Sequence, residues 1–175
     1  MFEKEIKILE INKKKVIKKL EEFWASKTFE DIVYDVYYDY CDSKMQDCDR
    51  LFRIRQKWDC LLYTIKKKEK SDNLKVCQEQ ECSITDLEWF KKTLEKYWLV
   101  PMREKRKFRV SYKIDDVEFD IDEYDWIPTF MEIEASDDEI IKDWIKKLWL
   151  KNNVKKTFWS RWLFEYYKVP YIDLK

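Results

Sequence analysis

The sequence of 175 residues contains no histidine and no glycine. Without histidine, Ser-His-Asp and Cys-His catalysis are excluded, and so is every metal site that uses an imidazole ligand. Without glycine, the sequence as written holds no P-loop and no G-x-G-x-x-G nucleotide-binding fingerprint. If a metal is bound, we therefore expect carboxylate ligands, which favour Mg²⁺ or Mn²⁺ over zinc.

The lack of glycine coincides with nine tryptophans, whereas average glycine usage is roughly 7%. Trp98 and Trp149 directly follow helical patterns, at the C′ position that favours glycine. We hypothesise that most of the tryptophans are glycine codons read with the wrong genetic code, which an intact mass from the native host would test. The alternative is a chain that is truly rich in tryptophan. Trp144 lies on an apolar helical face and is taken as genuine; the positions in question are Trp24, Trp58, Trp98, Trp126, Trp149, Trp159 and Trp162.

Positive and negative side chains balance, with 36 of each and a formal net charge of zero. Proteins that bind nucleic acid or membrane surfaces usually carry a net basic excess, so neither partner is expected. The N-terminus is charged from residue 3, and no apolar run reaches the length of a signal peptide or a membrane span. The five cysteines are odd in number and form no C-x-x-C pair, so we expect reduced thiols in a cytoplasmic protein. The length suits a single domain over residues 1–175.

Hydrophobic periodicity predicts three helices, over residues 12–23, 85–97 and 136–148, with a short fourth after Ser160. Asn12 is the expected N-cap of the first, and capping boxes are expected at Thr85 with Glu88 and at Ser136 with Glu139. Period-two alternation predicts strands. Their irregular order among the helices favours a mostly antiparallel α+β fold. The expected strands are 2–10, 33–40, 50–57, 60–68, 74–82, 103–113, 116–123 and 129–135.

Six of these strands carry charges on one face and apolar residues on the other. For one strand, a solvated outer face is the ordinary explanation. Here the charges are sorted, with bases on some strands and acids on others, and three amphipathic helices need an apolar surface to cover. A sheet curled into a barrel, with a charged lumen and helices outside, satisfies both demands. Such a lumen suits a polyanion with a divalent cation, because carboxylates bind the metal while Arg and Lys bind phosphate.

An ordered set of motifs resembles the CYTH domain, the triphosphate tunnel metalloenzyme family. The segment Glu3-Lys-Glu5-Ile-Lys7 matches the family signature E-x-E-x-K. The resemblance covers about residues 1–170 and implies an eight-stranded antiparallel β-barrel tunnel. The further landmarks, in chain order, are Leu51-Phe-Arg53-Ile-Arg55, Thr64-Ile-Lys66, Lys107-Phe-Arg109, Phe119-Asp-Ile-Asp122 and Phe130-Met-Glu132-Ile-Glu134.

The resemblance also implies roles for individual residues. It makes Glu3, Glu5 and Glu134 metal ligands for Mg²⁺ or Mn²⁺. Glu132 and Asp122 would support a metal or a water, and Lys7 would polarise the scissile phosphate or position water. Cys77 stands where relatives often carry a further arginine. The residues expected to hold the triphosphate are Arg53, Arg55, Lys66, Lys107 and Arg109.

Three functions remain open at this point. The first is hydrolysis of a small-molecule triphosphate, such as inorganic tripolyphosphate, thiamine triphosphate or a nucleoside triphosphate. The second is conversion of ATP to cyclic AMP and pyrophosphate by a class IV adenylate cyclase. The third is a non-catalytic module that binds polyphosphate or nucleotide. We favour hydrolysis, because cleavage of a triphosphate demands no recognition of a base, and we expect a monomer or a homodimer.

Overall fold

The computed structural model describes residues 2–69 and 74–170, with side chains from residue 4 onward. Within this part of the chain, one antiparallel sheet of nine strands is surrounded by five helices. The strands are β1 (Phe2–Ile8), β2 (Ser26–Asp39), β3 (Arg50–Lys57), β4 (Cys60–Glu69), β5 (Lys75–Ser83), β6 (Val100–Ile114), β7 (Val117–Tyr124), β8 (Ile127–Ala135) and β9 (Lys155–Lys156). The helices are α1 (Lys13–Glu22), α2 (Lys44–Asp47), α3 (Leu87–Lys96), α4 (Asp138–Lys147) and α5 (Ser160–Tyr167).

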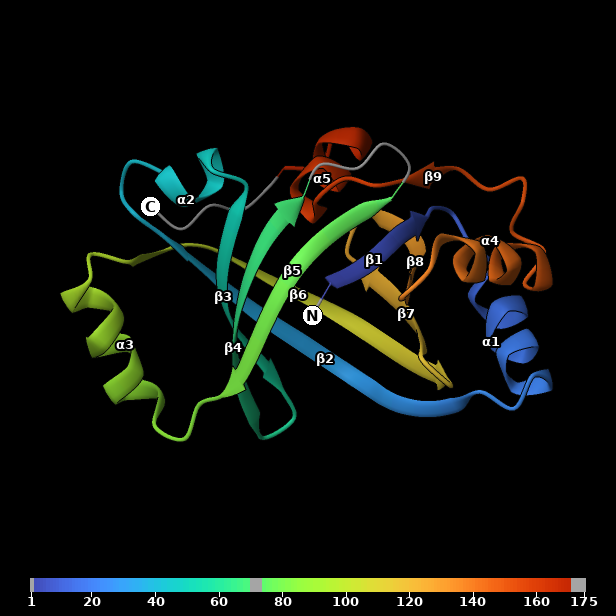
Figure 1. Ribbon diagram of the computed structural model, residues 1–175, viewed down its shortest axis with the longest axis horizontal. Coiled ribbons are helices and arrows are strands. Elements are labelled where there is room, and N and C mark those ends of the chain that lie inside the picture. The colour runs from blue at the N-terminus through green and yellow to red at the C-terminus, as the bar shows by residue number, and fades with distance from the viewer. Residues whose placement is uncertain (1, 70–73, 171–175) are drawn as a thin grey trace.

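The sheet closes into the expected barrel of eight antiparallel strands. Its order is β5-β4-β3-β2-β6-β7-β8-β1, and β1 pairs with β5 to complete the circle. The short strand β9 adds to the end of β1. The long strands β2 and β6 cross the whole molecule (Figure 1). Closure leaves each strand with one face toward the lumen and one toward the outside, so alternate residues point into the tunnel.

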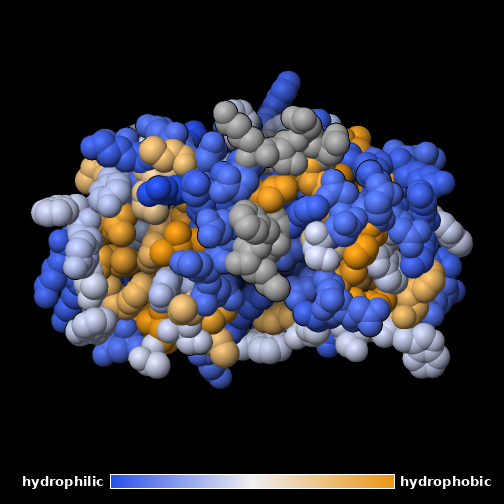
Figure 2. Space-filling model, in the orientation of Figure 1, coloured by the Kyte–Doolittle hydropathy of each residue, from blue (hydrophilic) through white to orange (hydrophobic). Residues whose placement is uncertain are grey.

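The helices cover the apolar outer face in three groups. Helices α1 and α4 lie side by side over β6, β7, β8 and β1, where Leu20 and Trp144 join the largest apolar cluster (Figure 1). Helix α3 packs through Leu94 on the outer face of β2 and β3. Helix α5 inserts Leu163 beside Leu9 and Phe130, near one end of the barrel. The surface between these groups is mostly hydrophilic on the face drawn in Figure 2.

The structure corrects several details of the expected elements. The capping-box predictions at Thr85 and Ser136 were wrong. The neighbouring aspartates Asp86 and Asp137 are the N-caps instead, and their carboxylates accept backbone N–H groups of the first turn. The prediction for Asn12 is confirmed, since its side chain accepts from Lys15 N. None of the helices in the described residues is long and apolar enough to cross a membrane.

Strand β2 is the largest departure in length, because it begins at Ser26 rather than residue 33. Its first half is polar and pairs with β6 alone, whereas its second half pairs with both β3 and β6. Its exposed polar residues give no apolar alternation, so periodicity could not find this segment. Helix α2 and strand β9 were likewise not predicted, since each spans only a few residues.

Candidate functional site: a charged tunnel

A cavity of about 170 Å³ lies inside the barrel, and most of the residues that line it are charged. Each strand of the barrel contributes residues at alternate positions, as its pleat requires. Of the residues expected to form the site, nine line this cavity: Glu5, Lys7, Arg53, Arg55, Lys66, Lys107, Arg109, Glu132 and Glu134. Strand β1 carries Glu3 opposite Cys77 of β5, but the side chain of Glu3 lies outside the described residues.

Bases gather on one part of the wall, formed by β3, β4 and β6. Arg53 Nε lies 3.3 Å from the hydroxyl of Thr64 on β4, and its guanidinium is 3.7 Å from Glu79. Lys66 is paired with the same glutamate. On β6, Lys107 and Arg109 line the tunnel, while Arg106 lines a cavity on the outside of the barrel. With Arg55 of β3, the lumen cations of this wall number five, and all are buried and line the same cavity: Arg53, Arg55, Lys66, Lys107 and Arg109.

Acids gather on the opposite part, formed by β7, β8 and β1. Glu134 of β8 lies directly across from Glu118 of β7 and from Glu5 of β1 in the strand registers. One step along the tunnel, Glu132 lies across from Asp120 and from Lys7. Three neighbouring strands therefore form a patch of carboxylates at matched heights, with one lysine at its edge.

Lys7 borders this patch and contacts two of its carboxylates, those of Glu5 and Glu132. Its ammonium lies 2.5 Å from Glu5 Oε1 and 2.7 Å from Glu132 Oε1, and the side chain is 2% exposed. Burial alone would lower the pKa of Lys7, but the two carboxylates raise it above its ordinary value. Burial alone would raise the pKa of Glu5, but the charges of Lys7 and Lys75 lower it to about 2. Both members of the Lys7–Glu5 pair are therefore charged at neutral pH.

Asp122 has a different position from the other expected acids. It is completely buried and accepts hydrogen bonds from Lys107 Nζ and from Arg109 Nε, both at 2.6 Å. Arg109 also reaches Glu132 at 2.9 Å and is paired with Asp120. The contacts of Asp122 therefore fix two cations of the base wall, and Arg109 links that wall to the carboxylate patch.

Several lumen residues were not identified from the sequence. Asp35 of β2 holds Arg55 by two bonds, of 2.6 and 2.9 Å, and Tyr37 lies beside it. Burial would raise the pKa of Asp35, but Arg55 holds it below its usual range. Lys75 of β5 lies 2.8 Å from Glu5 Oε2. The alternation of Val33, Asp35 and Tyr37 was the available signal, but one charge between a valine and a tyrosine made that face look apolar.

The donor set fits a hard divalent cation, because the acids on β1, β7 and β8 offer oxygen ligands from adjacent strands. Among the described side chains, however, no group of three or more acids or cysteines is already arranged to hold a metal ion. Lys7 explains this, since its ammonium lies between Glu5 and Glu132. A cation entering the patch would therefore compete with Lys7 for those oxygens.

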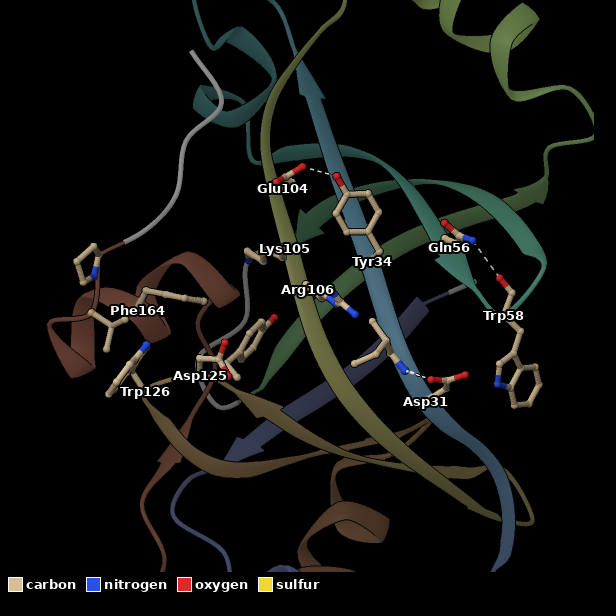
Figure 3. Close-up of a pocket in the computed structure, with 14 residues that line it drawn as sticks. Asp31, Tyr34, Gln56, Trp58, Glu104, Lys105, Arg106, Asp125, Trp126 and Phe164 are labelled. Carbon is tan, nitrogen blue, oxygen red and sulfur yellow. Dashed lines mark hydrogen bonds between the residues drawn. The ribbon is translucent and has the colours of Figure 1, made fainter.

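A larger cavity, of about 710 Å³, lies outside the barrel between β2, β6, the β7–β8 turn and α5 (Figure 3). Tyr34 donates to Glu104 within it, and Trp58 and Trp126 stand at its two sides (Figure 3). Among the residues that the structure describes, only two cations line it, Lys105 and Arg106. We place the candidate site in the smaller tunnel, because a polyanion needs clustered bases and a metal needs clustered acids.

Comparisons with known proteins agree with this geometry. A family model described as the CYTH domain matches residues 1–156. A Methanocaldococcus jannaschii protein named “putative adenylate cyclase” is 30% identical over 144 residues, which cover 80% of this chain and 80% of that protein.

Solved structures share the fold. That of a “putative adenylate cyclase” from Vibrio parahaemolyticus matches with a TM-score of 0.76 and 16% identity, over 94% of this chain and 98% of that one. A Hippeastrum protein, described as a “putative adenylyl cyclase” with a dominant triphosphatase activity, matches with a TM-score of 0.64 and 11% identity, over 97% and 96% of the two chains.

Proposed function

Because the chain belongs to the CYTH domain family, we propose that it hydrolyses a triphosphate inside the barrel. The observation that carries this proposal is the tunnel itself, in which arginines and lysines of β3, β4 and β6 face carboxylates of β1, β7 and β8. Phosphoryl transfer depends mainly on positioning and charge neutralisation, which this arrangement supplies. Inorganic tripolyphosphate, thiamine triphosphate and nucleoside triphosphates are the candidate substrates.

The cations would hold the phosphate chain. Arg53, Arg55, Lys66, Lys107 and Arg109 line the cavity, and Arg is suited to bidentate contacts with phosphate oxygens. Asp35 and Asp122 hold Arg55, Lys107 and Arg109 in place by ion pairs. Because these cations are positioned before substrate enters, little reorganisation is needed during the reaction.

The carboxylates would hold the metal and the water. Triphosphate tunnel enzymes of this family generally depend on a divalent metal. Glu3, Glu5 and Glu134 are the proposed ligands for Mg²⁺ or Mn²⁺, which would polarise phosphate oxygens when bound. Glu132 would orient the attacking water, and Asp122 would support Glu132 through Arg109, which contacts both carboxylates. Lys7 would donate to the scissile phosphate, since its ammonium is charged and faces the cavity.

The reaction is a hydrolysis. The water oxygen forms a bond to the terminal phosphorus, and the bond between that phosphorus and its bridging oxygen breaks. Diphosphate, or the corresponding organic diphosphate, leaves with the bonding electron pair, and the water proton passes to solvent or to a nearby carboxylate. The leaving group gains negative charge, which the nearby Arg and Lys side chains would stabilise.

A cyclase is the second candidate, and one observation favours it. The Methanocaldococcus jannaschii relative, at 30% identity, carries the name “putative adenylate cyclase”. In that reaction the ribose 3′-hydroxyl of ATP attacks the α-phosphorus and pyrophosphate leaves. The same lumen charges would serve both reactions, and the register of the phosphate chain along the tunnel would decide between them.

Phosphorus NMR on ATP and on tripolyphosphate, each with Mg²⁺ or Mn²⁺, tests the proposal. Orthophosphate and diphosphate from either substrate would establish the hydrolase, whereas cyclic AMP with pyrophosphate would establish the cyclase. The Glu134→Gln variant should lose turnover on the order of 100-fold or more. Metal-independent binding without turnover, kept or strengthened in Glu134→Gln, would instead identify a binding module.

We also propose that residues 1–175 act as one domain. The family model ends at residue 156, yet α5 lies beyond it and packs Leu163 against the barrel. Trp159 and Ser160, at the start of α5, line the tunnel cavity. Removal of α5 would therefore open one end of the site.

A further inference from the structure

Lys75 is a lumen cation that the family motifs do not include. It is the first residue of β5 and lies directly across from Glu5, in the strand pair that closes the barrel. Its ammonium is 2.8 Å from Glu5 Oε2 and 4.2 Å from the centre of the Trp159 ring. The residue is 6% exposed and lines the same cavity as Arg53 and Lys66.

Lys7 and Lys75 each form an ion pair with a different carboxylate oxygen of Glu5. Lys7 binds one carboxylate oxygen at 2.5 Å and Lys75 binds the other at 2.8 Å. Lys7 also binds Glu132 at 2.7 Å, so the two ammonium groups occupy oxygens that a divalent cation would need. A buried carboxylate that binds two lysines is well satisfied, and a metal bound to the same oxygens would repel both ammonium groups and favour their release.

An ammonium group released inside the tunnel would be available to bind the substrate. A cation bound to Glu5 would repel Lys7 and Lys75 across a few ångströms of poorly solvated space. A triphosphate in the cavity would give both lysines new negative partners. Cys77, two residues along β5 on the same face, ends in a thiol and not in a cationic group. Lys75 can supply a positive charge from the same strand.

We propose that Lys75 is a further triphosphate-binding residue, and that Lys7 and Lys75 exchange Glu5 for the phosphate chain when a divalent cation binds. This inference rests on the proposed function. The exchange makes metal and triphosphate cooperative ligands. Metal bound to Glu5 frees the two lysines for phosphate, and phosphate bound to the lysines frees Glu5 for the metal. By linkage, the factor by which metal strengthens triphosphate binding equals the factor by which triphosphate strengthens metal binding.

Binding measurements on the full chain without turnover test the exchange. Mn²⁺ affinity is measured by electron paramagnetic resonance, and the affinity of imidotriphosphate, a nitrogen-bridged analogue of tripolyphosphate, by calorimetry with saturating Mn²⁺. The variants are Lys75→Gln, Lys75→Arg, which keeps the charge, and Lys4→Gln as the matched control. Lys4 lies on β1 beside Glu5, but it points outward to Asp138 at 2.8 Å.

The expected result is a pair of opposite shifts. Lys75→Gln should bind Mn²⁺ alone roughly tenfold more tightly, because a competing charge is gone, and the analogue roughly tenfold more weakly. Lys75→Arg and Lys4→Gln should stay near wild type in both measurements. Damage to the fold would weaken the binding of both ligands together. Affinity changes of opposite sign therefore distinguish the exchange from a disrupted fold.

Other outcomes overturn the inference. If Lys75→Gln binds Mn²⁺ no more tightly than wild type, or binds the analogue equally well, then Lys75 is only a counter-ion of Glu5. If wild type binds Mn²⁺ and the analogue independently of one another, the exchange does not occur, although hydrolysis could still stand. If wild type binds neither ligand, the proposed function fails and this inference fails with it.

Discussion

Five tryptophans have backbone conformations that favour glycine. Trp24, Trp58, Trp98, Trp126 and Trp149 all have positive φ, between 50° and 66°. Trp24, Trp98 and Trp149 follow helices, and each takes part in the double hydrogen bond of a Schellman motif, as Trp24 N does with Glu21 O. A side chain in this conformation costs roughly 1–2 kcal/mol. The hypothesis of glycine codons remains a prediction, and these five positions support it more strongly than Trp159, whose φ is −62°.

Replacement of these tryptophans by glycine should stabilise the fold. We expect Trp24→Gly and Trp98→Gly each to raise the free energy of unfolding by about 1 kcal/mol in urea denaturation. Both side chains are largely exposed, at 91% and 77%, so little packing is lost. Trp144→Gly is the control and should destabilise by about 4 kcal/mol, because Trp144 is buried against Phe119. A loss of stability in Trp24→Gly or Trp98→Gly would mean that these indole rings contribute contacts of their own.

Because of the Asp35–Arg55 ion pair, we expect the stability of the fold to depend on acidic pH. The folded pKa of Asp35 is depressed, so its stabilisation is complete above the unfolded value of roughly 3.9 and is lost as the pH falls below it. In Asp35→Asn the free energy of unfolding should therefore fall less steeply between roughly pH 5 and pH 2. At pH 7 this variant should be less stable by about 3 kcal/mol, since Arg55 is left as an unpaired buried charge.

Urea denaturation at a series of pH values measures both effects. Asp31→Asn, at an exposed position of the same strand, should change stability at pH 7 by less than about 0.5 kcal/mol. If Asp35→Asn matched wild type at both ends of the pH range, the pair would contribute nothing to the fold.

At the scale of elements, strand positions were largely readable from the sequence. In strand Arg50–Lys57, for example, Arg53 and Arg55 alternate with Phe52 and Ile54, because the lumen and the outer surface of this barrel demand opposite chemistry. The motif residues then fell on the lumen face with few exceptions, since the pleat leaves no freedom once one residue is placed.

Elements without such alternation could not be predicted from the sequence. The polar first half of β2 and the two-residue strand β9 carry no periodic signal. The ion-pair partners inside the tunnel could not be predicted from the sequence either. Lys75 meets Glu5 only because β5 closes the barrel against β1, and the sequence does not state which edge strands pair.

Helix α5 should contribute strongly to stability through one side chain. Leu163 is completely buried and packs with Leu9, Ile127 and Phe130. We expect Leu163→Ala to lower the free energy of unfolding by about 3 kcal/mol in urea denaturation. The surface change Glu165→Ala, one turn of the same helix away from Arg161, should cost less than about 0.5 kcal/mol. Equal small effects from both changes would show that α5 is not docked on the barrel.

At the scale of the whole molecule, the zero net charge conceals a strong internal separation. Bases and acids face one another across a lumen that the barrel largely shields from water, and they are partly neutralised by mutual ion pairs. Ions that satisfy both walls at once, a polyanion and a divalent cation, should therefore stabilise the folded chain beyond what the internal pairs achieve.

This linkage gives a prediction that needs no turnover. At a hundred times its Kd, imidotriphosphate with Mg²⁺ should raise the free energy of unfolding by about 2.7 kcal/mol, and removal of Mg²⁺ with EDTA should reverse most of that gain. Arg53→Gln should require a roughly tenfold higher concentration for the same effect, because one phosphate contact is lost. Lys147→Gln, which removes a positive charge from the outer surface of α4, should respond as wild type does. Thermal denaturation over a concentration series measures all of these, and an unresponsive wild-type chain would mean that the folded protein does not bind the triphosphate analogue.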